Sequence, residues 1–420
     1  GSCRRRACRA AIRGARGVTV KILVGDVLAM LATLADDSVD CVVTSPPYWG
    51  LRDYGTARWE GGDPNCDHRS PTMREGRNEE RPKLAGSAAT NSYQLKLMHS
   101  RPCGKCGAVK VDEQIGLEPT LGEHLAVMIA VFREVQRVLK PTGTLWLNYG
   151  DCYATTPNGR SAADTKAAGS DDRTFRDKPF STIGGVLKPK DLCMIPNRLA
   201  IALQEDGWWV RSEIIWHKLN PMPESIRDRP TVSHEKLFLL TKSERYFYDA
   251  EAIMEPSSPQ SHARAARNRS DNHKWADGGP GNQSIAKGKP VAGRMLPAGV
   301  NPKAAEAPDG PRSKQNASFS EAVTDLVAMR NKRNVWSLTS ESFSEAHFAT
   351  FPTALVEPCI LAGCPDGGLV LDPFGGAGTT GLVADRLGRD AILIELNPEY
   401  AEMARRRIHG DAPLFAQVEA

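Results

Sequence analysis

Residues 369–380 constrain the fold of this chain more than any other feature. They form a short apolar run ending in Asp372, then a glycine-rich turn, then the start of a helix. Glycines let a backbone pass close to a ligand, and an acid at a strand end can accept a hydrogen bond from a ligand ammonium group. The next apolar run ends in Ile394 and Glu395, where a carboxylate can bind a ribose diol. The pattern predicts a nucleoside-cofactor site, and an ordinary turn with a surface glutamate is the alternative.

Strand and helix patterns alternate along much of the chain. Apolar β-branched runs bounded by turn residues indicate strands, and apolar residues at spacings of three and four indicate amphipathic helices. We expect strands at 20–24, 39–44, 144–148, 209–217, 236–241, 246–248, 369–371 and 391–394, and helices at 121–139, 197–205, 353–362, 379–387 and 398–408. This succession predicts an α/β fold that is Rossmann-like and doubly wound, with a mostly parallel sheet and an antiparallel strand pair around 209–241.

Two stretches without this pattern interrupt the sheet domain. Residues 55–116 lose apolar periodicity and read as an insertion, while 251–334 hold thirteen Lys/Arg against eight Asp/Glu in a loop-rich context. The first seventeen residues contain six arginines and no acid, and we interpret them as an expression scar or upstream read-through, with a transit peptide as the alternative. The predicted segments are a basic tail (1–17), three parts of the sheet domain (18–54, 117–250, 335–410), the insertion (55–116), the basic module (251–334) and a tail (411–420).

The composition excludes several classes of protein. Hydrophobic residues make up 40% and charged residues 25%, and no apolar stretch approaches the ~18 residues that a membrane-spanning helix needs. Ten cysteines in 420 residues are too sparse for a disulfide scaffold. We therefore expect a globular protein of a reducing, intracellular compartment. Monomer and homodimer both stay open.

A second motif follows the strand expected at 39–44. It reads Ser45-Pro46-Pro47-Tyr48. The prolines fix φ and remove N–H groups, so the carbonyls of Ser45 and Pro46 are left to accept hydrogen bonds, while Tyr48 offers a flat face. A rigid acceptor cluster beside an aromatic ring suits a planar base that bears an amino group. A strand ending in a stiff turn is the alternative.

The two motifs together resemble the S-adenosylmethionine-dependent DNA amino-methyltransferases, the N4-cytosine and N6-adenine family. Residues 45–48 look like the family's catalytic tetrapeptide and 372–378 like its cofactor loop. Residues 346–352 resemble the motif around the cofactor's methionine end, and 216–223 with 234–236 match another typical stretch. The catalytic motif precedes the cofactor loop, which is similar to the circularly permuted β-class.

The resemblance implies a set of site residues. Asp26 resembles the acid that contacts the adenine amino group, although it could equally cap the helix that follows it. The expected catalytic residues are Ser45, Pro46, Pro47 and Tyr48. The expected cofactor-binding residues are Asp26, His347, Phe348, Thr350, Pro352, Asp372, Phe374, Gly375, Gly376, Gly378, Thr379, Thr380, Glu395 and Asn397.

The resemblance also implies a mechanism. Accepting the two amine hydrogens at the Ser45 side chain and the Pro46 carbonyl would aim the nitrogen lone pair at the sulfonium methyl. The base must leave the duplex stack, with Tyr48 stacking on it, and transfer is direct rather than through a covalent adduct. Serine at the first position resembles the N4-cytosine subset, so we expect N4-methylcytosine as product and keep N6-adenine as the alternative.

The insertion contains two short chelating pairs, Cys66 with His68 and Cys103 with Cys106. Two such pairs separated by a loop fit a tetrahedral structural zinc site, with surface thiols as the alternative. A metal would also stabilise a segment with few apolar residues.

The basic module falls where β-class enzymes carry their target-recognition region. Its candidate DNA-binding residues are Arg264, Arg267, Arg269, Lys274, Arg330, Lys332 and Arg333. A solvated loop is the alternative. The expected partners are double-stranded DNA and, as a candidate, a cognate restriction endonuclease, with no membrane. The resemblance also implies the cytoplasm or nucleoid of a prokaryote or phage-infected cell as the location. Two rival functions stay open. A dinucleotide-dependent oxidoreductase leaves Ser-Pro-Pro-Tyr and the zinc pairs unexplained, and a non-catalytic zinc-dependent DNA-binding protein would not bind S-adenosylmethionine.

Overall fold

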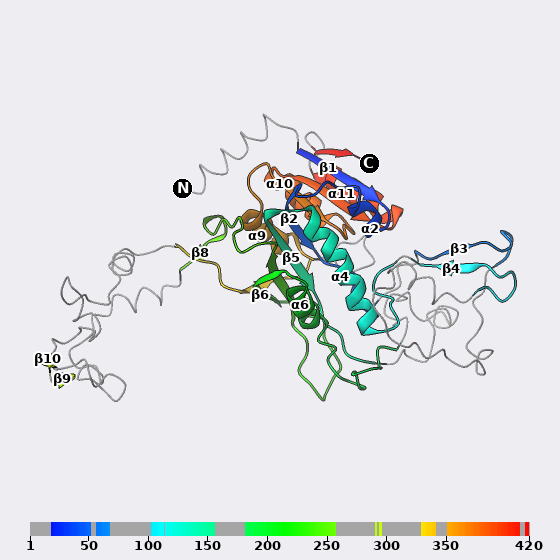
Figure 1. Cartoon of the computed structure of the whole chain (residues 1–420), viewed down its shortest axis with the longest axis horizontal. Coiled ribbons are helices and arrows are strands. Elements are labelled where there is room, and N and C mark those ends of the chain that lie inside the picture. The colour runs from blue at the N-terminus through cyan, green and yellow to red at the C-terminus, as the bar shows by residue number, and fades with distance from the viewer. Residues whose placement is uncertain are drawn as a thin grey trace. The chain divides into compact units, whose positions relative to one another are not determined.

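The computed structural model describes residues 18–51, 56–67, 102–112, 114–155, 181–257, 290–291, 294–295, 329–341, 351–411 and 416–419 (Figure 1). The chain divides into two compact units. The first comprises Gly1–Ala252 with Arg333–Ala420, and the second comprises Ile253–Lys332. None of the described helices is both long and apolar enough to cross a membrane.

A nine-stranded sheet forms the first unit, in the order β12-β6-β7-β5-β2-β13-β14-β1-β15. Every neighbouring pair is parallel except those of β7, which runs antiparallel to both β5 and β6. The strands are β1 (Val18–Val24), β2 (Val39–Thr44), β5 (Leu139–Tyr149), β6 (Trp209–Lys218), β7 (His234–Thr241), β12 (Val335–Leu338), β13 (Leu369–Asp372), β14 (Asp390–Glu395) and β15 (Ala416–Glu419). The mostly parallel sheet predicted from the sequence is confirmed.

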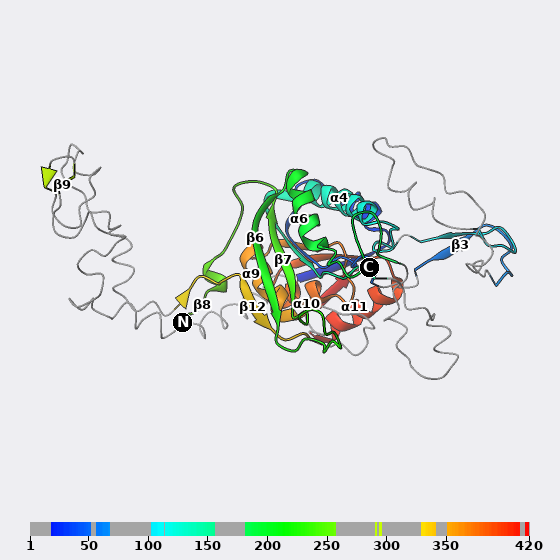
Figure 2. The ribbon, with the colours of Figure 1, turned by 90° about the horizontal axis from the view of Figure 1, so that it is seen from below.

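Helices cover both faces of this sheet. On one face α2 (Val27–Leu31) packs on α4 (Leu121–Val138), which packs on α6 (Ile195–Glu205). On the other face lie α9 (Thr353–Gly363), α10 (Thr379–Leu387) and α11 (Pro398–Asp411), and Figure 2 shows the two layers with the sheet between them. A capping box between Thr120 and Glu123 starts α4. Crossover helices on both sides are what parallel strands require.

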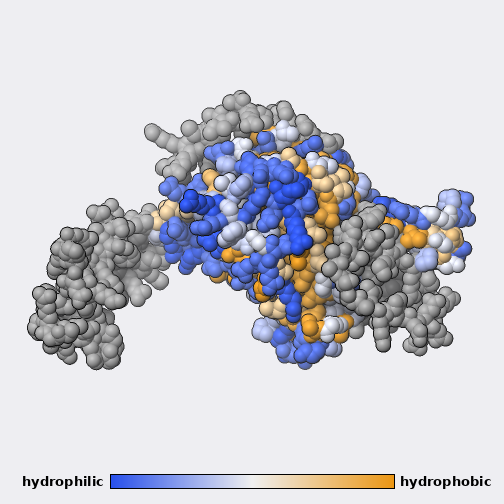
Figure 3. All heavy atoms as spheres, in the orientation of Figure 1, coloured by the Kyte–Doolittle hydropathy of each residue, from blue (hydrophilic) through white to orange (hydrophobic). Residues whose placement is uncertain are grey.

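The core lies between the sheet and these helices. Strands β2 and β13 are buried along almost their whole length, and α4 buries the stripe that contains Met128, Phe132 and Val135. In the space-filling view, hydrophilic residues cover most of the visible face of the sheet body, and hydrophobic residues show as a narrow band (Figure 3). The apolar residues thus pack inside the layers, as the hydrophobic effect requires.

The structure differs from the sequence prediction at three places. Residues 246–248 form no strand, although Phe247 N donates to Thr142 O at 2.8 Å. Strand β12 was not expected, because four residues carry too little pattern. The segment 411–420, expected to be a tail, contributes β15 beside β1.

Outside the large sheet the described strands are short. In the insertion, β3 (Arg58–Glu60) pairs antiparallel with β4 (Val109–Val111). In the second unit, β8 (Glu255–Pro256) pairs with β11 (Met329–Arg330), and β9 (Pro290–Val291) pairs with β10 (Arg294–Met295). Between β7 and β8 the chain forms a single turn of 3₁₀ helix, η2 (Glu251–Ile253).

Candidate active site

A cavity opens at the carboxyl ends of the parallel strands β1, β2, β13 and β14. Each of these strands contributes residues to the lining. They are Gly25 and Asp26 after β1, Ser45, Pro46, Pro47 and Tyr48 after β2, Phe374, Gly375, Gly376 and Thr379 after β13, and Glu395 at the end of β14 with Asn397 after it. The empty space is about 1120 Å³, open to solvent on one side. Ligands of open α/β sheets bind at this edge. The two motifs singled out in the sequence, far apart along the chain, therefore line one cavity.

The glycine-rich turn is held tightly against α11. Gly378 begins α10 with φ +75°, and a Cβ at this position would lie 2.8 Å from Ala404 Cβ. Arg407 Nη1 donates to Ala377 O at 3.0 Å and to Thr379 Oγ1 at 2.9 Å. Because both the backbone conformation and the space exclude a side chain, only glycine fits position 378.

Glu395 is the last residue of β14, and its side chain contacts the glycine-rich turn. Its Oε2 accepts from Gly376 N at 2.8 Å, and its Oε1 accepts from Asn397 N at 2.9 Å. Burial raises the pKa of this carboxyl above its ordinary value. Each carboxylate oxygen keeps a second acceptor position, so the group can still bind a ligand diol.

Asp26 combines the two uses that the sequence left open. Its Oδ1 accepts from Leu28 N and Ala29 N, both at 3.1 Å, so it caps α2. The residue also lines the cavity. The helix cap is therefore observed, and contact with a cofactor stays a prediction.

Asp372 does not point at the ligand space, which differs from the direct ammonium contact expected from the sequence. It is fully buried, and its Oδ1 accepts from Thr44 Oγ1 at 2.6 Å and from Phe374 N at 3.0 Å. Its Oδ2 accepts from Thr380 Oγ1 at 2.7 Å. Burial raises the pKa of Asp372 to about 6. The carboxyl ties β2, the glycine-rich turn and α10 together from beneath the cavity.

The remaining predicted cofactor residues have other positions. Gly378, Thr380 and Pro352, although described, are not among the cavity's lining residues, and Pro352 instead precedes the first residue of α9. His347, Phe348 and Thr350 lie outside the described residues. The neighbouring Phe351 does line the cavity.

Three polar side chains, those of Asn148, Lys218 and Glu235, meet beside the segment Ser45–Tyr48. Tyr48 Oη donates to Glu235 Oε2 at 2.8 Å. Asn148 Nδ2 lies 3.0 Å from the same Glu235 oxygen, 3.1 Å from Tyr48 Oη and 3.3 Å from Ser45 Oγ. Lys218 Nζ donates to Glu235 Oε1 at 2.5 Å. Burial, and then the charge of Glu235, hold the pKa of Tyr48 well above its ordinary value, so its hydroxyl stays a donor.

The ring of Tyr48 is packed on one side. It stacks on Tyr149 with ring centroids 4.8 Å apart and an interplanar angle of 28°. A Cβ at Gly150 would lie 2.5 Å from Tyr48 Cε2. Tyr149 and Gly150 thus form the surface on which the Tyr48 ring packs.

A second buried network holds the loop's backbone. Tyr149 Oη donates to Pro47 O at 3.2 Å, and His124 Nε2 lies 2.7 Å from the same hydroxyl. His124 Nδ1 lies 2.8 Å from Glu118 Oε2, and both residues are buried. Trp49 N donates to Tyr149 Oη at 3.2 Å. The Pro-Pro segment is therefore fixed by side chains of α4 and β5.

Sequence reasoning missed several of these residues. Glu235 and Lys218 appeared only within stretches that resemble the family, and Asn148 and His124 received no role. The signal that could have found Glu235 is the direction of β7. Because β7 runs antiparallel to β5 and β6, its amino end, which holds Glu235, lies at the same sheet edge as the carboxyl ends of those two strands. The cavity also includes Thr56, Gln114 and Ile115 from the two ends of the insertion.

The candidate DNA-binding residues are only partly described. Arg264, Arg267, Arg269 and Lys274 lie outside the described residues. Arg330 Nε donates to Glu255 Oε1 at 2.9 Å within the second unit, so a carboxylate already balances its charge. Arg333 is exposed and Lys332 is partly exposed.

A Ser-Pro-Pro-Tyr loop and a glycine-rich turn on one cavity of a mostly parallel sheet define an S-adenosylmethionine-dependent amino-methyltransferase. Residues 39–406 match the model of the N6/N4 methyltransferase family, described as DNA methylase. The chain belongs to this family of DNA methylases, whose substrate is double-stranded DNA. The predicted resemblance is confirmed, and the oxidoreductase and non-catalytic alternatives are set aside.

Several relatives match most of the chain. The type II methyltransferase M.Cfr9I of Citrobacter freundii is 36% identical over 92% of this chain and 87% of its own length. M.XycI of Xanthomonas campestris pv. cyanopsidis is 37% identical over 92% and 86%, and M.SmaI of Serratia marcescens is 36% identical over 92% and 90%. Among solved structures, the cytosine-N4-specific PvuII DNA methyltransferase aligns over 96% of this chain and 98% of its own, with 15% identity and a TM-score of 0.48.

Proposed function

We propose that this enzyme transfers a methyl group from S-adenosylmethionine directly to the N4 amino group of a cytosine flipped out of duplex DNA. The observation that carries the proposal is that Ser45, Pro46 and the glycine-rich turn line the same cavity. A site that holds the methyl donor and the acceptor amine in line makes the transfer effectively unimolecular, which lowers its barrier. The alternative acceptor is the N6 amino group of adenine.

The cofactor half of the cavity fits a nucleoside with a positively charged tail. Glu395 and Asp26 both line the cavity. In this proposal Glu395 accepts from the ribose diol and Asp26 accepts from the adenine amino group. The turn at Gly375 and Gly376 brings backbone rather than side chains to the ligand. S-adenosylmethionine supplies an electrophilic methyl group on its sulfonium sulfur. Asp372 acts indirectly, because its hydrogen bonds fix the turn that borders the cavity.

The base half of the cavity is built to activate a weak nucleophile. The lone pair of an exocyclic amine is delocalised into the ring, and two acceptors on its hydrogens turn the lone pair out of that plane. Ser45 Oγ and the Pro46 carbonyl serve as these acceptors, and Asn148 Nδ2 holds Ser45 from behind at 3.3 Å. As the N–CH₃ bond forms, the S–CH₃ bond breaks to leave a neutral thioether, and the surplus amine proton passes to water.

The choice of cytosine rests on Ser45. A neutral hydroxyl can donate as well as accept, which suits a base whose ring nitrogen beside the amine is an acceptor. Asn148 Oδ1, which is buried and has no hydrogen-bond partner among the described residues, adds an acceptor close to Ser45. Adenine N1 is also an acceptor, so the identity of the product decides between the two bases.

The test is to identify the methylated nucleoside. The protein is incubated with S-adenosylmethionine and mixed-sequence duplex DNA, the DNA is digested, and the nucleosides are separated by mass spectrometry. N4-methylcytosine supports the proposal. N6-methyladenine would keep the cofactor and the geometry of transfer but overturn the assignment of the base. A covalent enzyme–base adduct trapped with a mechanism-based analogue would overturn direct transfer.

We also propose that the enzyme is the modification half of a type II restriction–modification pair, as the names of its relatives suggest. The basic module 251–334 would then read the target sequence, with exposed Arg333 and partly exposed Lys332 beside phosphates. Plasmid DNA from cells that express the chain should resist one restriction endonuclease and remain sensitive to others. Sensitivity to every endonuclease tested, despite methylated DNA, would contradict the pairing.

A further inference from the structure

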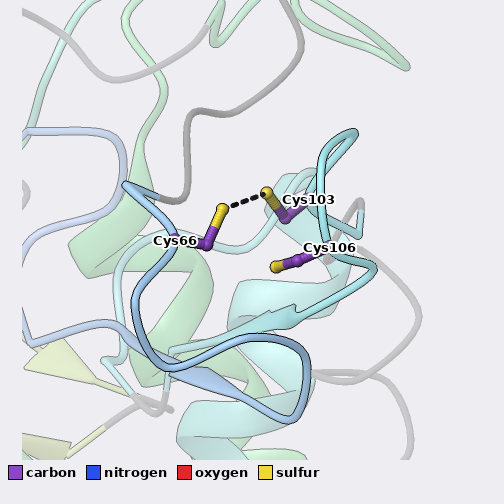
Figure 4. Close-up of side chains that lie close together, drawn as sticks. All are labelled: Cys66, Cys103 and Cys106. Atoms are coloured by element: carbon purple, nitrogen blue, oxygen red, sulfur yellow. Dashed lines mark hydrogen bonds between the residues drawn. The ribbon is translucent and has the colours of Figure 1, made fainter.

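Three cysteines of the insertion gather at one end of its strand pair. Cys66 lies in the turn that follows β3, and Cys103 and Cys106 lie in the turn that precedes β4 (Figure 4). Because β3 and β4 are antiparallel, these two turns adjoin. The three sulfur atoms all lie within 4.8 Å of one another. Residues 37 positions apart in the chain are thus brought together by folding.

The spacing of the sulfurs suits a shared metal ion. Cys66 Sγ lies 3.8 Å from Cys103 Sγ. A disulfide bond would require about 2.05 Å, so the two sulfurs are not bonded to each other. Two thiolates on one tetrahedral zinc, each at about 2.3 Å, lie about 3.8 Å apart. The Cys66–Cys103 distance matches this separation, and the third sulfur, which a simple pair of cysteines lacks, lies within 4.8 Å of both.

The backbone shapes both turns around the sulfurs. Gly107 N donates to Cys103 O at 2.8 Å, with Gly107 at φ +76°, which curls the Cys103–Cys106 turn so that its thiols share one side. Cys66 N donates to Asp63 O at 3.0 Å in the opposite turn. Gly62 passes so close that a Cβ would lie 2.7 Å from Cys106 Sγ. The turns are thus preorganised around the sulfur cluster.

The insertion also needs a cross-link. Strands β3 and β4 have three residues each, and an isolated two-stranded hairpin is marginally stable at best. Within its described residues, the buried apolar side chains are those of Cys103, Ala108 and Ile115. So small a core cannot offset the loss of backbone entropy on folding, whereas a structural zinc site contributes folding free energy directly.

We propose that Cys66, Cys103 and Cys106 bind a structural zinc ion that joins the two ends of the insertion. Thiolates are the ligands that select zinc, and a site closed by four protein ligands carries out no chemistry of its own. His68, predicted from the sequence as the fourth ligand, lies outside the described residues. Asp67 is the alternative fourth ligand among the described residues. Its Oδ1 lies 4.0 Å from Cys66 Sγ but already accepts from Lys105 Nζ at 2.5 Å.

The zinc ion would also order one wall of the active site. Thr56 Oγ1 donates to Asp112 Oδ1 at 2.9 Å, and Gln114 N donates to the same oxygen at 3.1 Å. Thr56 and Gln114 flank the β3–β4 pair and line the catalytic cavity. Loss of the metal should therefore loosen contacts at the cavity in addition to lowering stability.

The test is the metal content of the full chain purified without chelators. We expect one equivalent of zinc by mass spectrometry, and less than one tenth in Cys106→Ser. Cys152→Ser is the matched control, since Cys152 lies near a single cysteine, Cys193, with sulfurs 3.7 Å apart, and should keep the full equivalent. His68→Ala should lose most of the zinc while Asp67→Ala retains it, and the reverse result would overturn His68 as the ligand.

A spectroscopic readout keeps the proposal testable if a variant folds poorly. Cobalt-substituted wild-type protein should show thiolate-to-metal charge-transfer absorption and the strong visible bands of a tetrahedral ion. Wild-type protein with well under one tenth of an equivalent of zinc and no such absorption on cobalt titration would overturn the proposal. A Cys66–Cys103 disulfide in the protein as purified would do the same.

Discussion

Tyr48 Oη donates to Glu235 Oε2 at 2.8 Å, although 187 residues separate the two in the chain. The contact exists because β7 runs against the other strands and brings its amino end to the edge where β2 ends. Lys218 neutralises the other Glu235 oxygen at 2.5 Å. The tetrapeptide that we propose binds the base is thus held in place by a charged pair on β6 and β7.

Replacing Glu235 by alanine should slow catalysis without weakening cofactor binding. The change removes a charged acceptor of Tyr48 and Asn148, a loss of about 1.5–3 kcal/mol, which corresponds to roughly 10- to 100-fold in kcat. Glu235→Gln should be intermediate, since an amide oxygen still accepts but does not neutralise Lys218. Glu213→Gln, which breaks the Lys236 pair on the same strands, is the control. An unchanged kcat in Glu235→Ala would show that Tyr48 does not need this anchor.

Ser45→Ala should separate binding from turnover. Loss of the hydroxyl acceptor should lower kcat about 100-fold, because a group aimed at the reacting amine acts mainly in the transition state. Calorimetry should give an unchanged affinity for S-adenosylmethionine. Ser38→Ala, whose hydroxyl bonds only to Ala35 O among the described contacts, should behave like wild type. Full activity in Ser45→Ala would mean that the tetrapeptide assignment is wrong.

Asp372→Ala should abolish cofactor binding even though the side chain does not line the cavity. The change leaves the hydroxyls of Thr44 and Thr380 and the N–H of Phe374 without their common acceptor. Each buried group left unsatisfied costs about 1–3 kcal/mol. Calorimetric titration should detect no binding, while circular dichroism should show that the sheet persists. Wild-type affinity in this variant would refute the idea that Asp372 shapes the turn.

The raised pKa of Asp372 makes a prediction about stability and pH. The group titrates at about 6 in the folded protein and near 3.9 when unfolded, so between these values the folded state holds more protons. Its contribution is therefore fully present below pH 4 and is lost as pH rises through about 6. The loss is on the order of 3 kcal/mol. Urea unfolding of the wild type and of Asp372→Asn should show the wild type losing stability relative to the variant from pH 5 to 7. A constant difference would contradict the shift.

Gly150→Ala should displace the ring of Tyr48. The new Cβ would start 2.5 Å from Tyr48 Cε2, closer than any real contact, and the ring is already stacked on Tyr149. Overpacking of this kind costs about 1–3 kcal/mol in stability, and kcat should fall with it. Gly410→Ala, where nothing lies within 4 Å of the new Cβ, is the control. Equal stability of the two variants would show that the packing around the Tyr48 ring tolerates an added methyl group.

Much of the fold could be predicted from the sequence, because strand and helix patterns are local. Helix α10 begins and ends where the pattern predicted, and the pair β6 and β7 is antiparallel as expected. Strands β12 and β15 were missed, since each has four residues and gains its stability from the neighbour with which it pairs.

The lining of the cavity could be predicted only where one motif carried the information. Ser45 and Tyr48 follow a strand and Glu395 ends one, and the sequence marks strand ends clearly. Roles that depend on contacts between distant segments were not visible: Asp372 proved to bind Thr44 of another strand, and Asn148 proved to hold Ser45. Such partners depend on strand order and direction, which no local pattern specifies.

Strands β2 and β13 are neighbours in the sheet, yet Thr44 and Asp372, joined by a hydrogen bond, are 328 residues apart in the chain. A break in the polypeptide between β7 and β12 would leave the Ser-Pro-Pro-Tyr loop on one fragment and the glycine-rich turn on the other. Neither fragment could methylate DNA alone. DNA would then be methylated only where the two fragments associate, so methylation would report their association, as in a split reporter.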